Sequence, residues 1–255
     1  MRELKGIFTI WLREVKKFFR DRPRFFGSIA QPAFYLFVLG VGLSNSIKVF
    51  GFGQDGNFLE FMFPGIIGMT VLFTSFFNAI SIIWDREFGF LKEVLVSPVS
   101  RASIVIGKIL GGSTVALIQG LVILVFAPFL KIPLTFYGII KLIGLMLLTA
   151  VPISASGIAL ASRLKSVQGF QTITNFILMP MFFLSGAMFP LAGAPAWMVF
   201  VSKINPLSYG VDAMRYAITP DSRFQLFPLH VDIIVLAVFA MTLGAASVFF
   251  FSREE

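Results

Sequence analysis

Six long stretches without Asp, Glu, Lys or Arg constrain the fold of this chain more than any other feature. They cover residues 25–47, 61–84, 109–130, 142–162, 166–202 and 233–252. A helix crosses about 30 Å of hydrocarbon with about 20 apolar residues and satisfies its backbone hydrogen bonds internally, which lipid cannot do. Each stretch is long enough for a crossing, so the sequence predicts an all-α integral membrane protein.

The composition excludes a water-soluble protein of the same length. Hydrophobic residues make up 57% of the 255 residues and charged residues only 13%, whereas soluble domains carry about 25% charged residues. So few charges cannot cover the surface of a soluble enzyme. The chain contains no Cys, which also excludes disulfides, thiolate zinc sites and a cysteine nucleophile.

The fifth stretch is too long for one crossing and barely long enough for two. Pro190, Gly193 and Pro195 interrupt its second half, so we predict one crossing followed by a re-entrant extracellular hairpin with Trp197 at the membrane interface.

The predicted architecture is a single transmembrane domain over 1–255. It comprises an interfacial amphipathic helix over 1–24, transmembrane helices over 25–47, 61–84, 104–130, 138–162, 168–189 and 230–252, a cytoplasmic segment over 85–103 and the re-entrant region over 190–228.

The distribution of basic residues sets the orientation. Of the 21 Lys and Arg residues, eight precede the first predicted span, four lie between the second and third, two lie between the fourth and fifth, and one follows the last. Basic residues near span ends favour the cytoplasmic side. We therefore expect an inner-membrane protein with both termini in the cytoplasm, and the net charge of +8 gives no reason to expect a nucleic-acid partner.

The N-terminal segment has the pattern of a helix that lies on a membrane. Apolar residues recur at three- and four-residue steps, and basic residues fall largely outside that stripe. Basic side chains near anionic lipid contribute about 1 kcal/mol each. The helix is either a simple topology anchor or also a brace for a cytoplasmic partner. Its interfacial residues are Trp11, Arg13, Lys16, Lys17 and Arg20.

Motifs for chemistry are largely missing. Gly107-Lys108-Ile109 lacks the upstream Gly and the hydroxyl of a phosphate-binding loop. The single His230 is an interfacial residue rather than a metal ligand, because catalytic zinc takes three protein ligands. No carboxylate lies in the middle of a predicted span, which disfavours an ion-driven carrier. The sequence therefore predicts no catalytic, metal or cofactor site in this chain.

One cytoplasmic segment is dense in charges of both signs. Leu91, Val94 and Leu95 form an apolar stripe, and Pro98 ends it. The pattern predicts a short amphipathic helix between two spans, which is suited to docking a partner. A solvated loop is the alternative interpretation.

Two motifs resemble a known family. The segment Glu87-Phe88-Gly89-x-Leu91-x-Glu93-x-Leu95-x-Ser97-Pro98-Val99-Ser100-Arg101, followed by Gly107-Lys108, is similar to the cytoplasmic signature of type-2 ABC exporter permeases, the group of the daunorubicin-resistance and nodulation-factor exporters. The stretch from Asn205 to Arg215 resembles that family's motif before the last span. Phe90 stands where relatives commonly carry Thr. The resemblance covers nearly the whole chain.

The resemblance implies a half-transporter. Two such chains pair, most simply as a homodimer, and two copies of a separate nucleotide-binding subunit hydrolyse ATP with Mg²⁺, so that this chain itself is not an enzyme. The implied coupling residues to the ATPase are Glu87, Phe88, Gly89, Leu91, Glu93, Leu95, Pro98 and Arg101. The motif before the last span contributes Asn205, Pro206, Tyr209, Asp212 and Arg215.

The expected function is export of an amphipathic or lipid-like substrate such as a drug, a lipid or a lipid-linked glycan. A secondary carrier or channel without an ATPase is the alternative. An intramembrane enzyme is a third possibility, for which Asn78, Gln119 and Asn175 are the strongly polar groups deep in spans. Isolated amides in spans more often form hydrogen bonds across helices. The sequence does not specify the substrate, because function resides in sites that a fold leaves open.

Overall fold

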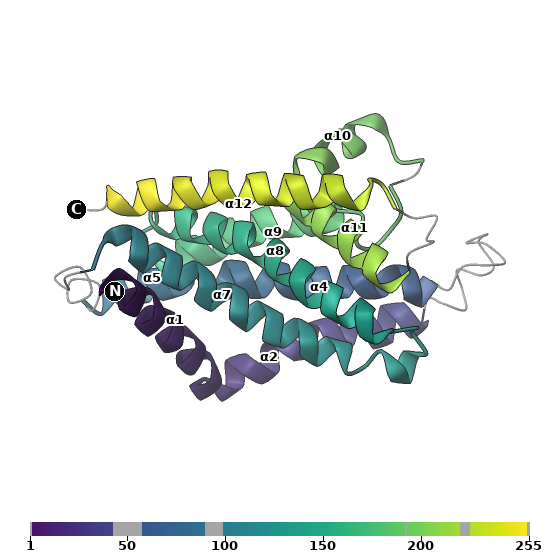
Figure 1. Ribbon diagram of the computed structural model, residues 1–255, viewed down its shortest axis with the longest axis horizontal. Helices are drawn as coiled ribbons and strands as arrows, with labels where there is room; N and C mark the ends of the chain where they lie inside the picture. Colours follow the sequence, from purple (N-terminus) through teal and green to yellow (C-terminus); the bar gives the residue numbers. More distant parts are fainter. Residues whose placement is uncertain (1, 43–57, 90–98, 192, 220–224, 254–255) are drawn as a thin grey trace.

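The computed structural model describes residues 2–42, 58–89, 99–191, 193–219 and 225–253. Within these ranges the regular structure is helical and no strand occurs. The helices pack side by side into an elongated bundle (Figure 1). The predicted all-α fold is therefore confirmed.

Among the described residues, four helical stretches are long and apolar enough to cross a membrane. They correspond to the second, third, fourth and sixth predicted spans. The second consists of α4 (Phe58–Phe77) and α5 (Ile80–Glu87), and the third consists of α7 (Arg101–Leu124) continued to Leu130 through the 3₁₀ turn η2 (Pro128–Leu130). The other two are α8 (Phe136–Ala161) and α12 (Leu229–Ser252).

The first and fifth predicted spans are shorter. The first begins in α2 (Arg22–Phe34) and continues in the π-helix η1 (Tyr35–Val41), and its predicted end at 43–47 lies outside the described residues. The fifth is α9 (Val167–Phe183), which ends before the predicted limit of 189. Pro180 removes a backbone donor from its last turn, and the chain reverses at Gly186, whose φ of 78° suits glycine.

The region after α9 contains two short helices. They are α10 (Ala196–Ile204) and α11 (Pro206–Ile218), so only α10 lies within the interrupted stretch. Asn205 separates them, because its side chain accepts a hydrogen bond from the Leu207 N–H at 3.0 Å and Pro206 suits the first helical position. Trp197 on α10 is exposed. Figure 1 shows α10 at the edge of the bundle, beyond α11.

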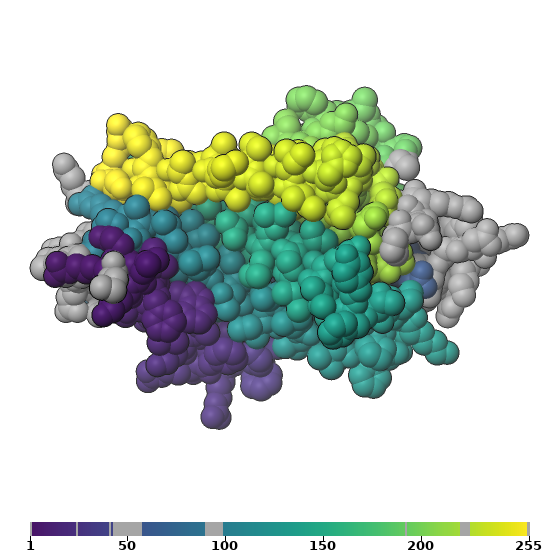
Figure 2. All heavy atoms as spheres, in the orientation of Figure 1, coloured from purple at the N-terminus to yellow at the C-terminus, as the bar shows by residue number. Residues whose placement is uncertain are grey.

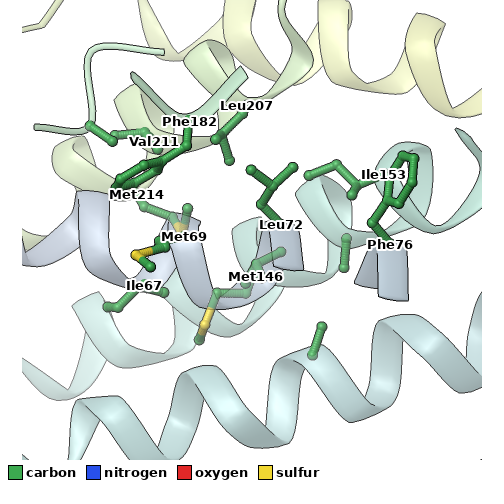
Figure 3. Packing of buried hydrophobic residues seen from close by; sticks show 14 of the residues in the cluster. Ile67, Met69, Leu72, Phe76, Met146, Ile153, Phe182, Leu207, Val211 and Met214 are labelled. Carbon is green, nitrogen blue, oxygen red and sulfur yellow. The ribbon is translucent and has the colours of Figure 1, made fainter. Parts of the chain in front are cut away.

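The core of the bundle is built around α4. Nearly all its side chains are buried, and α7, α8 and α11 pack against it. Figure 3 shows Met69, Leu72 and Phe76 of α4 facing Met146 and Ile153 of α8 and a group from α9 and α11. That last group consists of Phe182, Leu207, Val211 and Met214. Because α4 is apolar on all sides, it is enclosed by other helices.

The C-terminal helix α12 lies at the surface. It packs on α8, and few of its apolar side chains are fully buried, while several are exposed. Figure 2 shows it extending along the upper edge of the bundle with one side uncovered. An apolar helix exposed in this way is suited to contact with lipid or with a second apolar surface.

Side-chain contacts gather the predicted cytoplasmic segments at one end of the bundle, where both chain ends also lie (Figure 1). Helix α1 (Arg2–Arg20) reaches the start of α7, because Ser100 and Ser103 donate hydrogen bonds to the Glu3 carboxylate. Arg101 donates to the Ser252 carbonyl at 2.5 Å, and Arg86 donates to the Leu164 carbonyl at 2.5 Å. Both described ends of the chain therefore lie on the same side.

Candidate functional site

The most highly charged buried site lies where α1, α5 and α7 meet. The Lys108 ammonium on α7 lies 3.2 Å from Glu14 Oε1 on α1 and 3.0 Å from Asp85 Oδ2 on α5. It also donates to Ser81 Oγ at 3.0 Å. Arg13 Nη2 lies 2.6 Å from Asp85 Oδ2 and 3.1 Å from Glu14 Oε1. We name Arg13, Glu14, Asp85 and Lys108 the charge cluster.

Two glycines allow α1 to approach α7 this closely. A Cβ at Gly107 would lie 2.9 Å from Ile10 Cβ, and a Cβ at Gly111 would lie 2.6 Å from Glu14 Cβ. Small residues four apart leave a groove in which a second helix can pack. Trp11 on α1 donates an indole hydrogen bond to Thr114 Oγ1 at 2.9 Å. The Gly-Lys of the first family motif therefore forms the docking surface of α1.

The cations of the charge cluster keep Glu14 ionised. Burial by itself raises the pKa of Glu14, but the charges of Lys108 and Arg13 outweigh this effect and lower the pKa from 4.5 to about 2. Lys17, on the same helix, places its ammonium 5.1 Å from the Trp84 ring centre, and burial lowers its pKa. An isolated buried charge is costly, whereas charges that are paired and hydrogen-bonded are tolerated. The charge cluster therefore fixes α1 in position.

The charge cluster lies at the base of the predicted coupling segment. Helix α5 ends at Glu87, Phe88 is exposed, and Gly89 has a φ of 75°. The predicted helix from Glu87 therefore does not continue directly from α5. Helix α7 begins after Ser100, whose side chain accepts a hydrogen bond from the Ser103 N–H. The predicted coupling residues Leu91, Glu93, Leu95 and Pro98 lie outside the described residues.

The predicted interfacial residues of α1 divide between two environments. Lys16 and Arg20 are exposed, whereas Trp11, Arg13 and Lys17 are partly buried against the bundle. The apolar stripe divides in the same way. Ile10 and Phe18 face the bundle, while Leu4, Phe8 and Phe19 are exposed. Helix α1 therefore retains an exposed apolar edge beside basic residues while its other side packs on α7.

The second family motif joins segments at the opposite end of the bundle. The Asn205 side-chain amide donates to the Met181 carbonyl on α9 at 2.6 Å, and the Tyr209 hydroxyl donates to the Lys203 carbonyl at 2.7 Å. Pro206 occupies the first position of α11. These contacts tie α9, α10 and α11 together. They give the motif a structural role in the hairpin.

Asp212 and Arg215 extend this connection to the last span. Asp212 Oδ2 accepts hydrogen bonds from the Leu226 and Phe227 N–H groups, both at 2.9 Å. Arg215 donates to the Gly186 carbonyl at 3.1 Å, and its guanidinium carbon lies 4.3 Å from the Phe61 ring centre. We name Asn205, Tyr209, Asp212 and Arg215 the hairpin cluster. It fixes the approach to α12 from α11.

Sequence reasoning missed the charge cluster. Asp85 and Lys108 each border a charge-free stretch, and Glu14 lies within the predicted interfacial helix, so nothing in their sequence positions indicated that they meet. One signal was available, since Glu14 is an acidic residue in the middle of a mainly apolar and basic helix, beyond the first turn that holds Glu3. The described residues contain no group of three potential metal ligands, and the amides of Asn78 and Gln119 are buried within the bundle.

Comparison with known proteins agrees with both motifs. A family model described as ABC-2 type transporter matches residues 5–219. The transport permease ycf38 of Cyanophora paradoxa is 32% identical over 190 residues, covering 74% of this chain and 65% of that protein. The ycf38 permease of Pyropia yezoensis is 32% identical over 225 residues, covering 85% and 74%. The inner membrane transport permease YadH of Escherichia coli K12 is 25% identical over 211 residues, covering 82% and 80%.

The aligned region thus spans slightly less than two thirds of the Cyanophora protein, while the family match takes in α1, the charge cluster and the hairpin cluster. Both motifs quoted from the sequence fall within it. The match extends over most of the 255 residues. This chain belongs to the ABC-2 type transporter family.

Proposed function

We propose that this chain is the transmembrane subunit of an ATP-binding-cassette exporter. It moves an amphipathic or lipid-like substrate, such as a drug, a lipid or a lipid-linked glycan, outward across the membrane. ATP and Mg²⁺ bind to a separate nucleotide-binding subunit present in two copies, and a second permease chain, in the simplest case identical, completes the transporter. Family membership supports this assignment.

One observation carries the proposal furthest. Asp85 precedes the predicted coupling segment and Lys108 follows it, and their side chains meet at 3.0 Å. Glu14 of α1 joins the same pair. A force applied to this segment by a partner is therefore transmitted to α5, α7 and α1 together, because the ion pairs hold the three helices at one point. Such a junction suits a subunit driven by an external ATPase.

The proposed arrangement has six crossings in a single domain over 1–255. Helix α2 with η1 forms the first crossing and α9 the fifth, and α10 and α11 form the re-entrant extracellular region. The end that holds the charge cluster faces the cytoplasm of an inner membrane. Its excess of Lys and Arg supports this orientation, and the relative YadH is named as an inner membrane permease.

The proposed contact with the ATPase consists of an acidic and apolar surface. Glu87 and Glu93 suit a basic cleft on the partner, while Leu91 and Leu95 supply packing. Charge-assisted hydrogen bonds at such a surface contribute about 1.5–3 kcal/mol each, against about 0–1 kcal/mol for exposed pairs. Phe88, Gly89, Pro98 and Arg101 complete the proposed set.

The test is copurification from native membranes. The tagged chain is compared with the Leu91→Ala and Glu93→Ala double variant for bound ATPase, ATP hydrolysis and export. We expect wild-type amounts of the variant in the membrane but less bound ATPase or uncoupled hydrolysis. Arg2→Ala, which changes an exposed residue of α1, is the control. If no ATPase copurifies with the wild-type chain, the proposal fails in favour of a secondary carrier or channel.

A further inference from the structure

A cavity of about 470 Å³ lies between α1, α2, α4, α5, α7 and α9. None of its described lining residues belongs to the charge cluster or the hairpin cluster. Its volume lies within the range of about 300–1,000 Å³ that is typical of small-molecule sites. Gly27 and Ser28 of α2 line it, as does Gln171 near the start of α9. The lining therefore combines residues of α2 and α9 with residues of α4, α5 and α7.

One wall of the cavity carries uncharged polar groups. Gln31 and Gln171 are exposed, and within the described part of the chain neither amide has a hydrogen-bond partner. Behind them, Gln119 accepts a hydrogen bond from Thr74 and donates one to Ser28. An amide both donates and accepts hydrogen bonds. The exposed amides of Gln31 and Gln171 can therefore donate hydrogen bonds to a ligand and accept hydrogen bonds from it.

Aromatic side chains form a second part of the lining, the aromatic wall. Phe73, Phe77 and Trp84 line the cavity, and the flat faces of such rings pack against apolar tails and against the C–H faces of sugar-like rings. Asp21 is the single charged side chain among the described lining residues, and its charge is negative. Lys17 lies over the Trp84 ring but does not itself line the cavity.

We infer that this cavity binds an amphiphile with an uncharged, hydroxyl-rich head group. Hydroxyls satisfy the free amides of Gln31 and Gln171, and the tail packs on the aromatic wall. A phosphate or carboxylate head group would find no basic side chain among the described lining residues to balance its charge, so it binds less well. This inference rests on the proposed function for its role, since the bound amphiphile would then be the exported substrate.

The test uses photoreactive labelling of the chain alone in lipid nanodiscs, without ATP. The probe is decyl glucoside with a diazirine in its tail, and labelled peptides are located by mass spectrometry. Unlabelled decyl glucoside, decyl phosphate and decyltrimethylammonium, which share the tail, are the competitors. We expect labelling of peptides from α4 and α5. The concentration of decyl phosphate or decyltrimethylammonium that halves this labelling should be at least tenfold higher than the corresponding concentration of decyl glucoside.

Two variants and a matched control test the amides. Gln31→Leu with Gln171→Leu lowers labelling at least fivefold, whereas Asn175→Leu, one turn further along the exposed face of α9, leaves it unchanged. Gln171→Lys alone shifts the preference toward decyl phosphate. Labelling spread over α12, or equal competition by the charged amphiphiles, overturns the inference. Absence of saturable labelling in a wild-type chain that copurifies an ATPase rejects the site and leaves the proposed function standing.

Discussion

Lys108 joins three helices through its side chain. Its side chain is 2% exposed, and its partners come from two other helices, one about twenty residues before it and the other in α1. Replacing a buried ion pair by apolar groups is often neutral, but removing one partner leaves the other charge uncompensated. The arrangement of the charge cluster therefore depends on each of its members.

Lys108→Met is expected to destabilise the docked position of α1 by about 3–5 kcal/mol, because it leaves Glu14 and Asp85 with Arg13 as the only cation of the charge cluster. The measurement is iodide quenching of Trp11 in a background with Trp84→Phe and Trp197→Phe. Lys16→Met, an exposed lysine of α1, is the control. Equal quenching in the Lys108 variant and the control would show that the ion pairs do not hold α1.

The low pKa of Glu14 predicts a specific pH dependence. Because the docked pKa is about 2 and the ordinary value is 4.5, ionised Glu14 stabilises docking fully above about pH 4.5. This contribution is lost as the pH falls from 4.5 toward 2. Quenching of Trp11 by iodide should rise as the pH falls through that window. In the Glu14→Gln variant, quenching should change little over the same pH range. A transition centred above pH 5 would assign the effect to another group.

At the scale of elements, the groove on α7 decides where α1 lies. Gly111→Leu is expected to displace α1 from α7, since overpacking costs about 1–3 kcal/mol and the new side chain would meet Glu14. Gly144→Leu on α8 is a matched control, because a Cβ there meets nothing within 4 Å. Thermal unfolding and Trp11 quenching report the result, and similar values for the two variants would contradict close packing at Gly111.

The hairpin cluster makes a second prediction. Asp212→Ala leaves the N–H groups of Leu226 and Phe227 without their acceptor, and because both residues are partly buried the cost is at most about 1–3 kcal/mol for each group. We expect faster amide hydrogen exchange at these two positions and a lower unfolding temperature. Lys203→Ala, an exposed side chain of α10, should change neither. Unchanged exchange at 226 and 227 in the Asp212 variant would contradict the role assigned to the hairpin cluster.

The sequence predicted the elements better than their contacts. Charge-free stretches locate α4 with α5, α7, α8 and α12, because hydrocarbon sets a minimum length. They overestimated α9, since a run of uncharged residues does not show that the chain turns at Gly186. The contact between Glu14 and Lys108 could not be predicted, because it depends on how α1 crosses α7. Two glycines of α7 set that crossing, and their spacing indicates a packing groove only when it is known that α1 packs there.

At the scale of the whole molecule, orientation is directly testable. The chain has no Cys, so Lys165→Cys and Ala196→Cys provide single thiol probes at exposed positions. An impermeant maleimide added to intact cells should label only position 196, because the loop after α8 is predicted to be cytoplasmic and α10 extracellular. Labelling of position 165 alone would invert the orientation, and labelling of both would mean a different number of crossings.

The docking of α1 on α7 also fixes an order of events during synthesis. Glu14 and Lys108 are 94 positions apart in the chain, and ribosomes add about 5–20 residues per second. The first helix therefore exists for roughly 5–20 s before its binding groove has been made. During that interval its acidic and basic side chains remain in contact with water and lipid headgroups. The ion pairs of the charge cluster can form only after α7 has been made and has packed against α1. A nascent chain in which this packing does not occur keeps an unpaired N-terminal helix that cellular quality control can recognise.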